Sequence, residues 1–274
     1  MDARENERRG GGAWRGWLPA VLAAASFGAS GCGGTFWDTV TRRDFTMNML
    51  FNPPDALTVL RDSQDADDRA RAMRSLREPL QNGGDQKDQD LIVKVLTTAA
   101  KSDRQVVCRM AAISSLRHFK DPRAIDGLKD AYYAAGSFSP ETATILRCQS
   151  IDALGATGQP AAVELLVKVL KEPPVEGATA DKQQKMDERI AAARALGHFK
   201  EYQSTEALAD VLKTDQDVAL RNRATESLCT ITGKTLPADY QPWADFLNAP
   251  GNKDAIAHGQ TENKGIDLIG WWWK

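Results

Sequence analysis

A short block of residues recurs five times in this chain, at intervals of about 40 residues. Each copy begins with an arginine, has small residues three and six positions later, and has a leucine seven positions later. Positions i, i+3 and i+7 lie on one face of an α-helix, so every copy predicts a helix with a stripe of small residues and leucine. The block arginines are Arg69, Arg109, Arg147, Arg189 and Arg221, and the block leucines are Leu76, Leu116, Leu154, Leu196 and Leu228.

A second apolar segment follows the block after a short turn, as in residues 91–96 and 161–170. Pro122 and Pro160 stand at the start of two such segments, where a helix tolerates proline because the first-turn N–H has no partner. Acidic residues precede several of the first helices, at the dipole end that favours negative charge. They are Asp65, Asp103 and Asp215. Each block therefore predicts a pair of helices.

The block reads approximately as Asp-x-x-Val-Arg-x-x-Ala-x-x-Ala-Leu-Gly, then a turn, then Pro-x-Ala-Ile-x-x-Leu, and it resembles the HEAT/PBS-lyase-like repeat. The resemblance implies an all-α fold: a HEAT-like α-solenoid, a right-handed superhelix of about five helical hairpins. A solenoid exposes an apolar face at each end and needs a cap there. Trp243, Phe246 and Leu247, at i, i+3 and i+4, predict a C-terminal cap helix, and residues 45–60 are expected to close the first repeat.

The N-terminal segment has a different pattern, with Arg4, Arg8, Arg9 and Arg15 ahead of an apolar run over residues 17–27. This order predicts a secretory signal, because the apolar run is far short of the roughly 20 residues that span a bilayer. Ala29-Ser30-Gly31-Cys32 resembles the lipobox of bacterial lipoproteins, which implies that Cys32 is acylated and becomes the first residue after cleavage. The alternative is a buried helical hairpin that happens to end in Gly-Cys.

These patterns divide the chain into four parts. Residues 1–31 are expected to be the lipoprotein signal peptide, and residues 32–53 a tether and N-terminal segment. Residues 54–249 form the predicted solenoid with its C-terminal cap. Residues 250–274 are polar and contain several glycines, so they predict a flexible tail, which ends in Trp271, Trp272, Trp273 and Lys274.

The charge balance excludes one class of partner. The chain has 35 basic and 37 acidic side chains and a formal net charge of -2, so it lacks the basic excess that nucleic-acid binding requires. Without residues 1–31, three cysteines remain, Cys108, Cys148 and Cys229, and none forms a Cys-x-x-Cys pair. Cys108 and Cys148 flank block arginines of neighbouring copies, where they either form a disulfide or stay buried thiols.

The sequence contains no nucleophile elbow, phosphate loop, dinucleotide fingerprint or zinc-protease motif. His118 and His198 fall at the same offset in two copies, which favours a solvent-facing structural role in a turn over metal binding. The block arginines favour hydrogen bonds between repeats over an anion-binding ladder. We therefore expect no catalytic residue, no metal, no cofactor and no enzymatic activity.

Three segments depart from the repeat and are candidate binding loops: residues 79–88, 132–140 and 172–186. Aromatic residues dominate contacts between proteins, so Tyr132, Tyr133 and Phe138 are candidate partner-binding residues, together with Trp271, Trp272 and Trp273. The expected function is a non-catalytic protein–protein interaction scaffold, lipid-anchored in the bacterial cell envelope and facing the periplasm, whose second helices line a concave surface. The partner is a protein that the sequence does not name, and Gly33 after Cys32 favours the outer membrane. The alternatives are an enzyme or enzyme-associated subunit with a groove that no motif reveals, and a spacer without a specific partner.

Overall fold

Each block forms the first helix of a pair, as the repeat predicts. The computed structural model describes residues 55–173 and 177–257, and regular structure in these ranges is entirely helical. The first helices are α5 (Ala66–Ser75), α7 (Val106–Leu116), α9 (Pro140–Thr157), α11 (Thr179–Leu196) and α13 (Val218–Thr232). The second helices are α6 (Gln86–Ser102), α8 (Pro122–Ala134), α10 (Val163–Leu170), α12 (Tyr202–Thr214) and α14 (Tyr240–Asn248). The short helices α4 (Ala56–Asp62) and α15 (Asn252–Ala257) flank the pairs.

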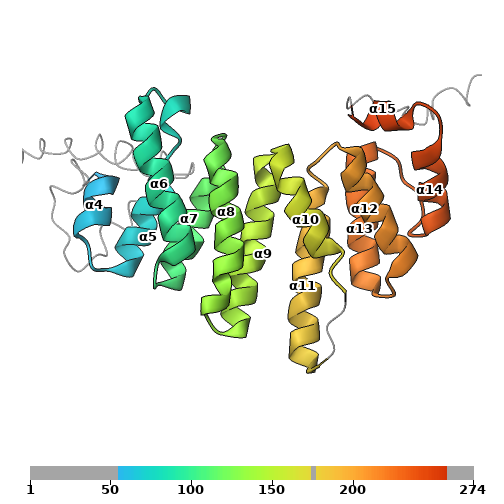
Figure 1. Cartoon of the computed structure of the whole chain (residues 1–274), viewed down its shortest axis with the longest axis horizontal. Helices are drawn as coiled ribbons and strands as arrows, with labels where there is room; N and C mark the ends of the chain where they lie inside the picture. The colour runs from blue at the N-terminus through green and yellow to red at the C-terminus, as the bar shows by residue number, and fades with distance from the viewer. Residues whose placement is uncertain (1–54, 174–176, 258–274) are drawn as a thin grey trace, which may run out of the picture. The chain divides into compact units, whose positions relative to one another are not determined.

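The pairs stack side by side in chain order (Figure 1). The first helices pack successively, α5 on α7, α7 on α9, α9 on α11 and α11 on α13, and second helices pack likewise where α6 meets α8 and α12 meets α14. This arrangement confirms the predicted all-α, HEAT-like solenoid. The chain divides into two compact units, Met1–Asp55 and Ala56–Lys274, and all of these helices belong to the second.

The small and leucine positions of the block form the core between first helices. The five block leucines are buried, and so are the small residues that precede them at most copies. Two of the small residues are serines whose hydroxyls bond the preceding first helix: Ser115 Oγ donates to Met73 O at 2.7 Å and Ser227 Oγ to Ala193 O at 2.8 Å. The small side chains therefore allow close approach of the backbones and also join successive repeats.

Four of the five block arginines bond to residues in the turns or at the helix ends of the repeats, and Arg147 pairs instead with Glu188 of α11. Arg109 Nε donates to Asp103 O at 2.8 Å, and its Nη1 donates to Ala134 O at 3.1 Å. The Asp103 carboxylate in turn pairs with Arg69 of the preceding block. The same arrangement recurs near the C-terminus, where Arg189 pairs with the Asp215 carboxylate at 2.7 Å and Arg221 donates to the Asp215 carbonyl at 3.4 Å. Consecutive blocks are thus linked through one turn aspartate.

Side chains at the helix starts explain where the helices begin. Asp65 caps α5 by accepting bonds from Asp67 N and Asp68 N, and Pro122 occupies the first turn of α8, both as predicted. Asp103 and Asp215 lie two residues before the N-caps of α7 and α13: each accepts from the backbone N–H of the N-cap residue, Gln105 and Asp217 respectively. Trp243 and Leu247 are buried in α14, which confirms the cap helix.

The structure corrects three of the predicted loops and tails. Residues 132–140 are not an open loop, because α8 continues to Ala134 and the 3-10 helix Ala135–Ser137 follows it directly. Residues 172–186 are partly helical, since α11 begins at Thr179. Residues 252–257 form α15 instead of a flexible tail: Ile256 is buried and Asn252 Nδ2 donates to Phe246 O at 2.7 Å.

Several predicted features lie outside the described residues: the signal peptide, Cys32, the tether and Trp271 to Trp273. Within the described ranges, none of the helices combines the length and apolar character that a bilayer span requires.

Candidate functional site

The adjacent tyrosines at the end of α8 have opposite environments. Tyr133 is 57% exposed, whereas Tyr132 is 6% exposed and belongs to the core. Their rings meet edge to face, with centroids 5.2 Å apart. Adjacent residues on a helix point about 100° apart, and here the core lies on the side of Tyr132. Tyr132 is therefore too buried to offer much surface to a partner, whereas Tyr133 stays an exposed candidate contact residue that packs on Tyr132.

A buried carboxylate holds Tyr132 in place. Glu188 on α11 is 2% exposed and accepts from the Tyr132 hydroxyl at 3.2 Å and from Arg147 Nη1 at 3.1 Å. Lys185 Nζ donates to the same carboxylate at 3.2 Å and also pairs with Glu172. Burial and the nearby Glu188 raise the pKa of Tyr132 above its usual range, so this hydroxyl stays a donor. We call these four side chains (Tyr132, Arg147, Lys185 and Glu188) the Glu188 cluster.

The sequence analysis did not find Glu188, although one signal was present. The residue before the block arginine is Cys108, Leu146 or Leu220 in three of the four other copies, and all three are buried; the first copy has the partly exposed Asp68 there. A glutamate at a position that is apolar in its neighbours indicates a charge enclosed by the fold, which must then have polar partners. Arg147, Lys185 and Tyr132 are those partners.

Phe138 is only partly available for contact. It packs against the core directly after the 3-10 helix, and the guanidinium of Arg109 lies 4.6 Å from its ring centroid. Because Arg109 is also bonded to Asp103 O and Ala134 O, Phe138 covers an arginine that joins repeats. Its main role in the structure is therefore to shield that arginine.

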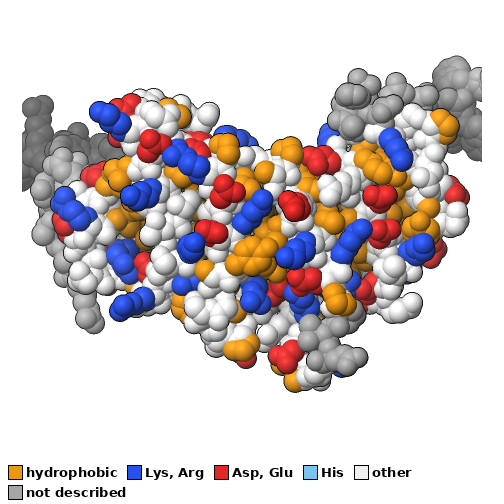
Figure 2. All heavy atoms as spheres, viewed as in Figure 1, with side chains coloured by type: hydrophobic (Ala, Val, Ile, Leu, Met, Phe, Trp, Pro, Cys, Tyr) orange, Lys and Arg blue, Asp and Glu red, His pale blue; other side chains and the backbone are white. Residues whose placement is uncertain are grey.

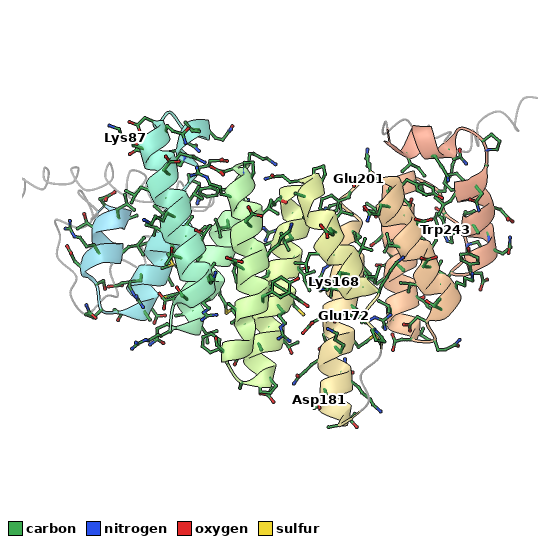
Figure 3. All side chains as sticks on the ribbon, in the orientation of Figure 1. Lys87, Lys168, Glu172, Asp181, Glu201 and Trp243 are labelled. Carbon is green, nitrogen blue, oxygen red and sulfur yellow. The ribbon has the colours of Figure 1, made fainter. Side chains whose placement is uncertain are left out.

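The exposed ring of Tyr133 lies beside the next second helix. Lys168 Nζ of α10 is 5.8 Å from the ring centroid, a cation–π contact between α8 and α10. Figure 3 shows Lys168 on α10 and Glu172 just beyond the end of that helix. Ion pairs also join second helices, with Lys101 bonded to Asp130 at 3.0 Å and Lys171 to Asp210 at 2.9 Å. In the view of Figure 2, acidic and basic side chains alternate, with hydrophobic side chains between them.

A pocket of about 830 Å³ lies between α10, α11 and α12. Met186 and Arg189 of α11, Ala207 and Val211 of α12, and Asp215 after α12 contribute to its lining. Arg189 is 5% exposed, and its Nε donates to Leu170 O at 3.0 Å. Its Nη1 is buried without a hydrogen-bond partner. We call this the Arg189 pocket.

His118 and His198 are exposed in the turns after α7 and α11, the positions predicted for a structural role. Partial loss of water around its ring, together with the charges of Arg117 and Arg77, lowers the pKa of His118, which favours the neutral form. In the part of the chain that the structure describes, no group of three or more His, Cys, Asp or Glu side chains could hold a metal ion.

The three described cysteines are free thiols, so Cys108 and Cys148 are not joined to each other. Cys108 is buried, and its Sγ donates to Ala66 O at 3.4 Å. Cys148 is half-buried on α9, next to Arg147 of the Glu188 cluster.

The repeat assignment has independent support from comparison with known families. Residues 109–133 and 146–172 match the model of the PBS lyase HEAT-like repeat. The matched segments correspond to α7 with most of α8, and to α9 from Leu146 with α10. A search of curated proteins finds no match to the chain.

Proposed function

We propose that this protein is a non-catalytic scaffold that holds a partner protein on its second helices, anchored by lipid at Cys32 in the bacterial cell envelope. HEAT-like repeats commonly mediate interactions between proteins, and two copies here match that family. The observation that carries the proposal is the exposed Tyr133 on a buried, fully bonded support. An aromatic side chain that is already held in position loses little conformational entropy on binding.

The side chains beneath and beside Tyr133 support this proposal. Tyr132 fixes the ring of Tyr133 from beneath, and the Glu188 cluster fixes Tyr132. Lys168 presents a positive charge beside the ring, which suits a partner surface with both apolar and acidic groups. The neighbouring ion pairs keep the rest of the surface balanced in charge.

Site-specific photocrosslinking in cells tests the partner. A benzophenone amino acid replaces Tyr133 in one variant and Ile145 in the control; Ile145 is 54% exposed and lies on the first helix α9. We expect a discrete crosslinked protein from position 133 and none from position 145. Equal labelling from both positions, or none from position 133, would contradict a specific surface on the second helices.

The tryptophan triplet is a second candidate contact. Deleting residues 271–274 should lower recovery of the partner while the melting temperature stays unchanged. A lower melting temperature instead would assign the triplet to packing within this protein.

The lipid anchor is tested separately. Several acyl chains hold a protein to a membrane far more firmly than one, at about 0.8 kcal/mol per buried methylene. Cys32→Ser removes the acceptor thiol, so we expect the protein to move from the membrane fraction to the soluble fraction. Membrane retention of this variant at the level of the unmodified chain would sink the lipidation hypothesis.

A further inference from the structure

We propose that the segments joining α5 to α6 and α7 to α8 form a binding site for a phosphate group, supplied by the headgroup of an anionic phospholipid. The site is a pocket of about 260 Å³ whose lining includes Arg77 and Asn82 from the first segment and His118 and Lys120 from the second. We call it the turn pocket. It belongs to the first two helix pairs, α5 to α8, blue to green in Figure 1. The choice of a lipid rests on the proposed anchor at Cys32, whereas the phosphate chemistry rests on the pocket alone.

The cations of the turn pocket are accessible from solvent. Arg77, His118 and Lys120 are all exposed, so their donors can reach a group that enters from outside. Within the described part of the chain, only Nη1 of the Arg77 guanidinium has acceptors: Arg74 O at 2.8 Å and Leu76 O at 3.2 Å. Its Nε and Nη2 are left as a fork that matches two oxygens of a phosphate.

A second arginine, Arg117, adds to the positive charge at the turn pocket. It is exposed and makes no side-chain hydrogen bond or ion pair with any described residue. Partial loss of water and the charges of Arg117 and Arg77 lower the pKa of His118, so both guanidiniums act on the same ring. By contrast, the exposed Arg123 pairs with Asp90 at 2.7 Å. Two cations that no described acid neutralises favour an anion supplied from outside.

The lining of the turn pocket includes one carboxylate, Glu78, and its oxygens are already bonded. Glu78 is 6% exposed, and its Oε1 accepts from Asp121 N at 2.9 Å and from Gln89 Nε2 at 3.0 Å. Its Oε2 accepts from Lys120 N at 2.7 Å. The carboxylate therefore holds two backbone N–H groups of the next repeat, and the permanent cations of the lining, Arg77 and Lys120, outnumber it.

Comparison of the repeats shows that the fold does not need a cation at these positions. Arg77 and Arg117 each follow a block leucine directly, and the third and fourth copies have Gly155 and Gly197 there. Glycine has no side chain, so the contacts between repeats form without one at this position. Arginine at the same position of two consecutive repeats therefore indicates a ligand rather than a requirement of packing.

A phosphate group fits the size and the chemistry of the turn pocket. The pocket is smaller than the roughly 300–1,000 Å³ of sites for drug-sized ligands, so it suits one small polar group. Phosphate has more acceptor oxygens than a carboxylate, and these can accept from Arg77, from Lys120 Nζ and from the side-chain amide of Gln81 together. Anionic lipids attract a cationic patch close to a membrane, and these two repeats are the first in the chain after the proposed anchor at Cys32.

Histidine NMR tests the site with an internal control. His118 and His198 share one repeat offset, but Gly197 precedes His198 where Arg117 precedes His118. The full chain, labelled with ¹³C-histidine and held in a non-ionic detergent, is titrated separately with inorganic phosphate, dihexanoyl-phosphatidylglycerol and dihexanoyl-phosphatidylcholine. At constant pH we expect inorganic phosphate and the phosphatidylglycerol to shift the His118 signal saturably, the phosphatidylglycerol at lower concentration. The His198 signal should stay in place, and phosphatidylcholine should shift neither signal.

The arms of this titration separate the two sources of phosphate. A saturable shift with inorganic phosphate but none with phosphatidylglycerol overturns the assignment to a lipid headgroup. Equal shifts with phosphatidylglycerol and phosphatidylcholine also overturn it, because a zwitterionic lipid would then serve as well. No saturable shift of His118 with any probe, or equal shifts at His118 and His198, overturns the site itself.

A matched pair of variants locates the binding. Arg117 and Arg104 are both exposed, and neither side chain has a hydrogen bond or ion pair with a described residue. Arg117→Gln removes a cation beside the pocket and should weaken binding of phosphate and phosphatidylglycerol by about tenfold or more. Arg104→Gln changes the net charge equally and should leave binding unchanged. Equal weakening by the two variants would show attraction by net charge alone and refute the site.

The site and the anchor can fail independently, because the short-chain lipids test the site without the anchor. If Cys32→Ser releases the protein from the membrane while His118 responds to no probe, the anchor stands and the turn pocket falls. If His118 responds to phosphatidylglycerol while Cys32→Ser stays in the membrane fraction at the level of the unmodified chain, the turn pocket stands and the anchor falls.

Discussion

Glu188 is a charge in a position that neighbouring repeats give to buried apolar residues. Removing a carboxylate from water costs several kcal/mol, so such a group persists only with close partners of opposite charge and further hydrogen bonds. Arg147 and Lys185 supply the charge, and Tyr132 supplies a neutral donor. The three partners come from α8, α9 and α11, so this single residue joins three helices.

The adjacent tyrosines give a direct test of this bonding. Tyr132→Phe removes the hydroxyl that donates to buried Glu188, and we expect it to lower the free energy of unfolding by about 1–3 kcal/mol. Tyr133→Phe is the control, because that ring is mostly exposed and its change should stay within about 0.5 kcal/mol. Urea denaturation followed by circular dichroism measures both. Equal effects of the two substitutions would show that the buried hydroxyl contributes nothing specific.

Cys148 provides a test through pH. Burial, with the nearby carboxylate of Glu188, raises the pKa of its thiol to about 12. Only the thiolate reacts with iodoacetamide, and an unperturbed thiol has a pKa of about 8.5, so at pH 8 we expect the native chain to react about 1000-fold more slowly at Cys148 than the unfolded chain. The native rate should keep rising about tenfold per pH unit up to pH 11. Mass spectrometry of the labelled peptide measures the rate, and a plateau near pH 9 would contradict the raised pKa.

The sequence predicted an aromatic contact residue in this segment, but it did not predict the buried Glu188 cluster that supports Tyr133 from within the fold. An aromatic pair at a repeat boundary was sufficient to propose a contact site. Which of Tyr132 and Tyr133 faces outward depends on where α8 ends, and that end is set by tertiary contacts with α9 and the following 3-10 helix. The pocket at Arg189 was equally hidden, since its lining comes from α10, α11 and α12, which only the packing of the repeats brings together.

At the scale of the elements, close approach of first helices depends on the small positions of the block. A Cβ added at Gly155 of α9 would lie 2.8 Å from Ala195 Cβ and 2.9 Å from Ala195 Cα on α11. Real Cβ atoms do not approach the backbone of another helix this closely, so the two helices would have to separate.

Gly155→Ala should therefore destabilise the protein although alanine favours a helix by about 1 kcal/mol. We expect a net loss of about 1–3 kcal/mol from overpacking against α11. Gly158→Asn serves as the comparison, because Gly158 ends α9 at a φ of 64° with open space around it, and asparagine tolerates that conformation. Thermal melts of both variants measure the difference. A stabilised Gly155→Ala chain would show that α9 and α11 can separate without loss.

The sequence predicted helices correctly where the block is regular. The prediction failed where a segment of polar composition is helical in the structure. The leucine spacing gave the first helices, and Pro122 correctly marked the start of α8. Residues 250–257 begin with Pro-Gly and contain a single large apolar residue, Ile256, so their sequence predicted a polar tail. In the structure Ile256 is nevertheless buried. The contacts that hold α15 are made with distant residues: Lys253 Nζ lies 4.2 Å from the Tyr202 ring centroid, and Asn252 bonds Phe246. No local pattern encodes such contacts.

At the scale of the whole molecule, most helix packing is between neighbouring repeats along the stack, although the Tyr132–Glu188 hydrogen bond joins the second repeat to the fourth. Stability in such a protein is approximately a sum of repeat terms and nearest-neighbour interface terms. A defect in a terminal repeat should therefore stay local, whereas a defect in a central repeat weakens interfaces on both sides. The turn aspartates strengthen this coupling, because Asp103 and Asp215 each bond the arginines of two consecutive blocks.

Two block leucines at the same repeat offset test this difference. Leu76 closes the first block at the end of α5, and Leu154 is fully buried in α9 at the centre. Each change to alanine removes buried methyl groups and should cost about 2–5 kcal/mol locally. We expect hydrogen exchange in Leu76→Ala to accelerate in α4 to α7 alone, since α5 packs on α7, and in Leu154→Ala to accelerate across α7 to α11. Uniform acceleration over every helix in both variants would show that the repeats unfold as one cooperative unit, and the nearest-neighbour account would then be wrong.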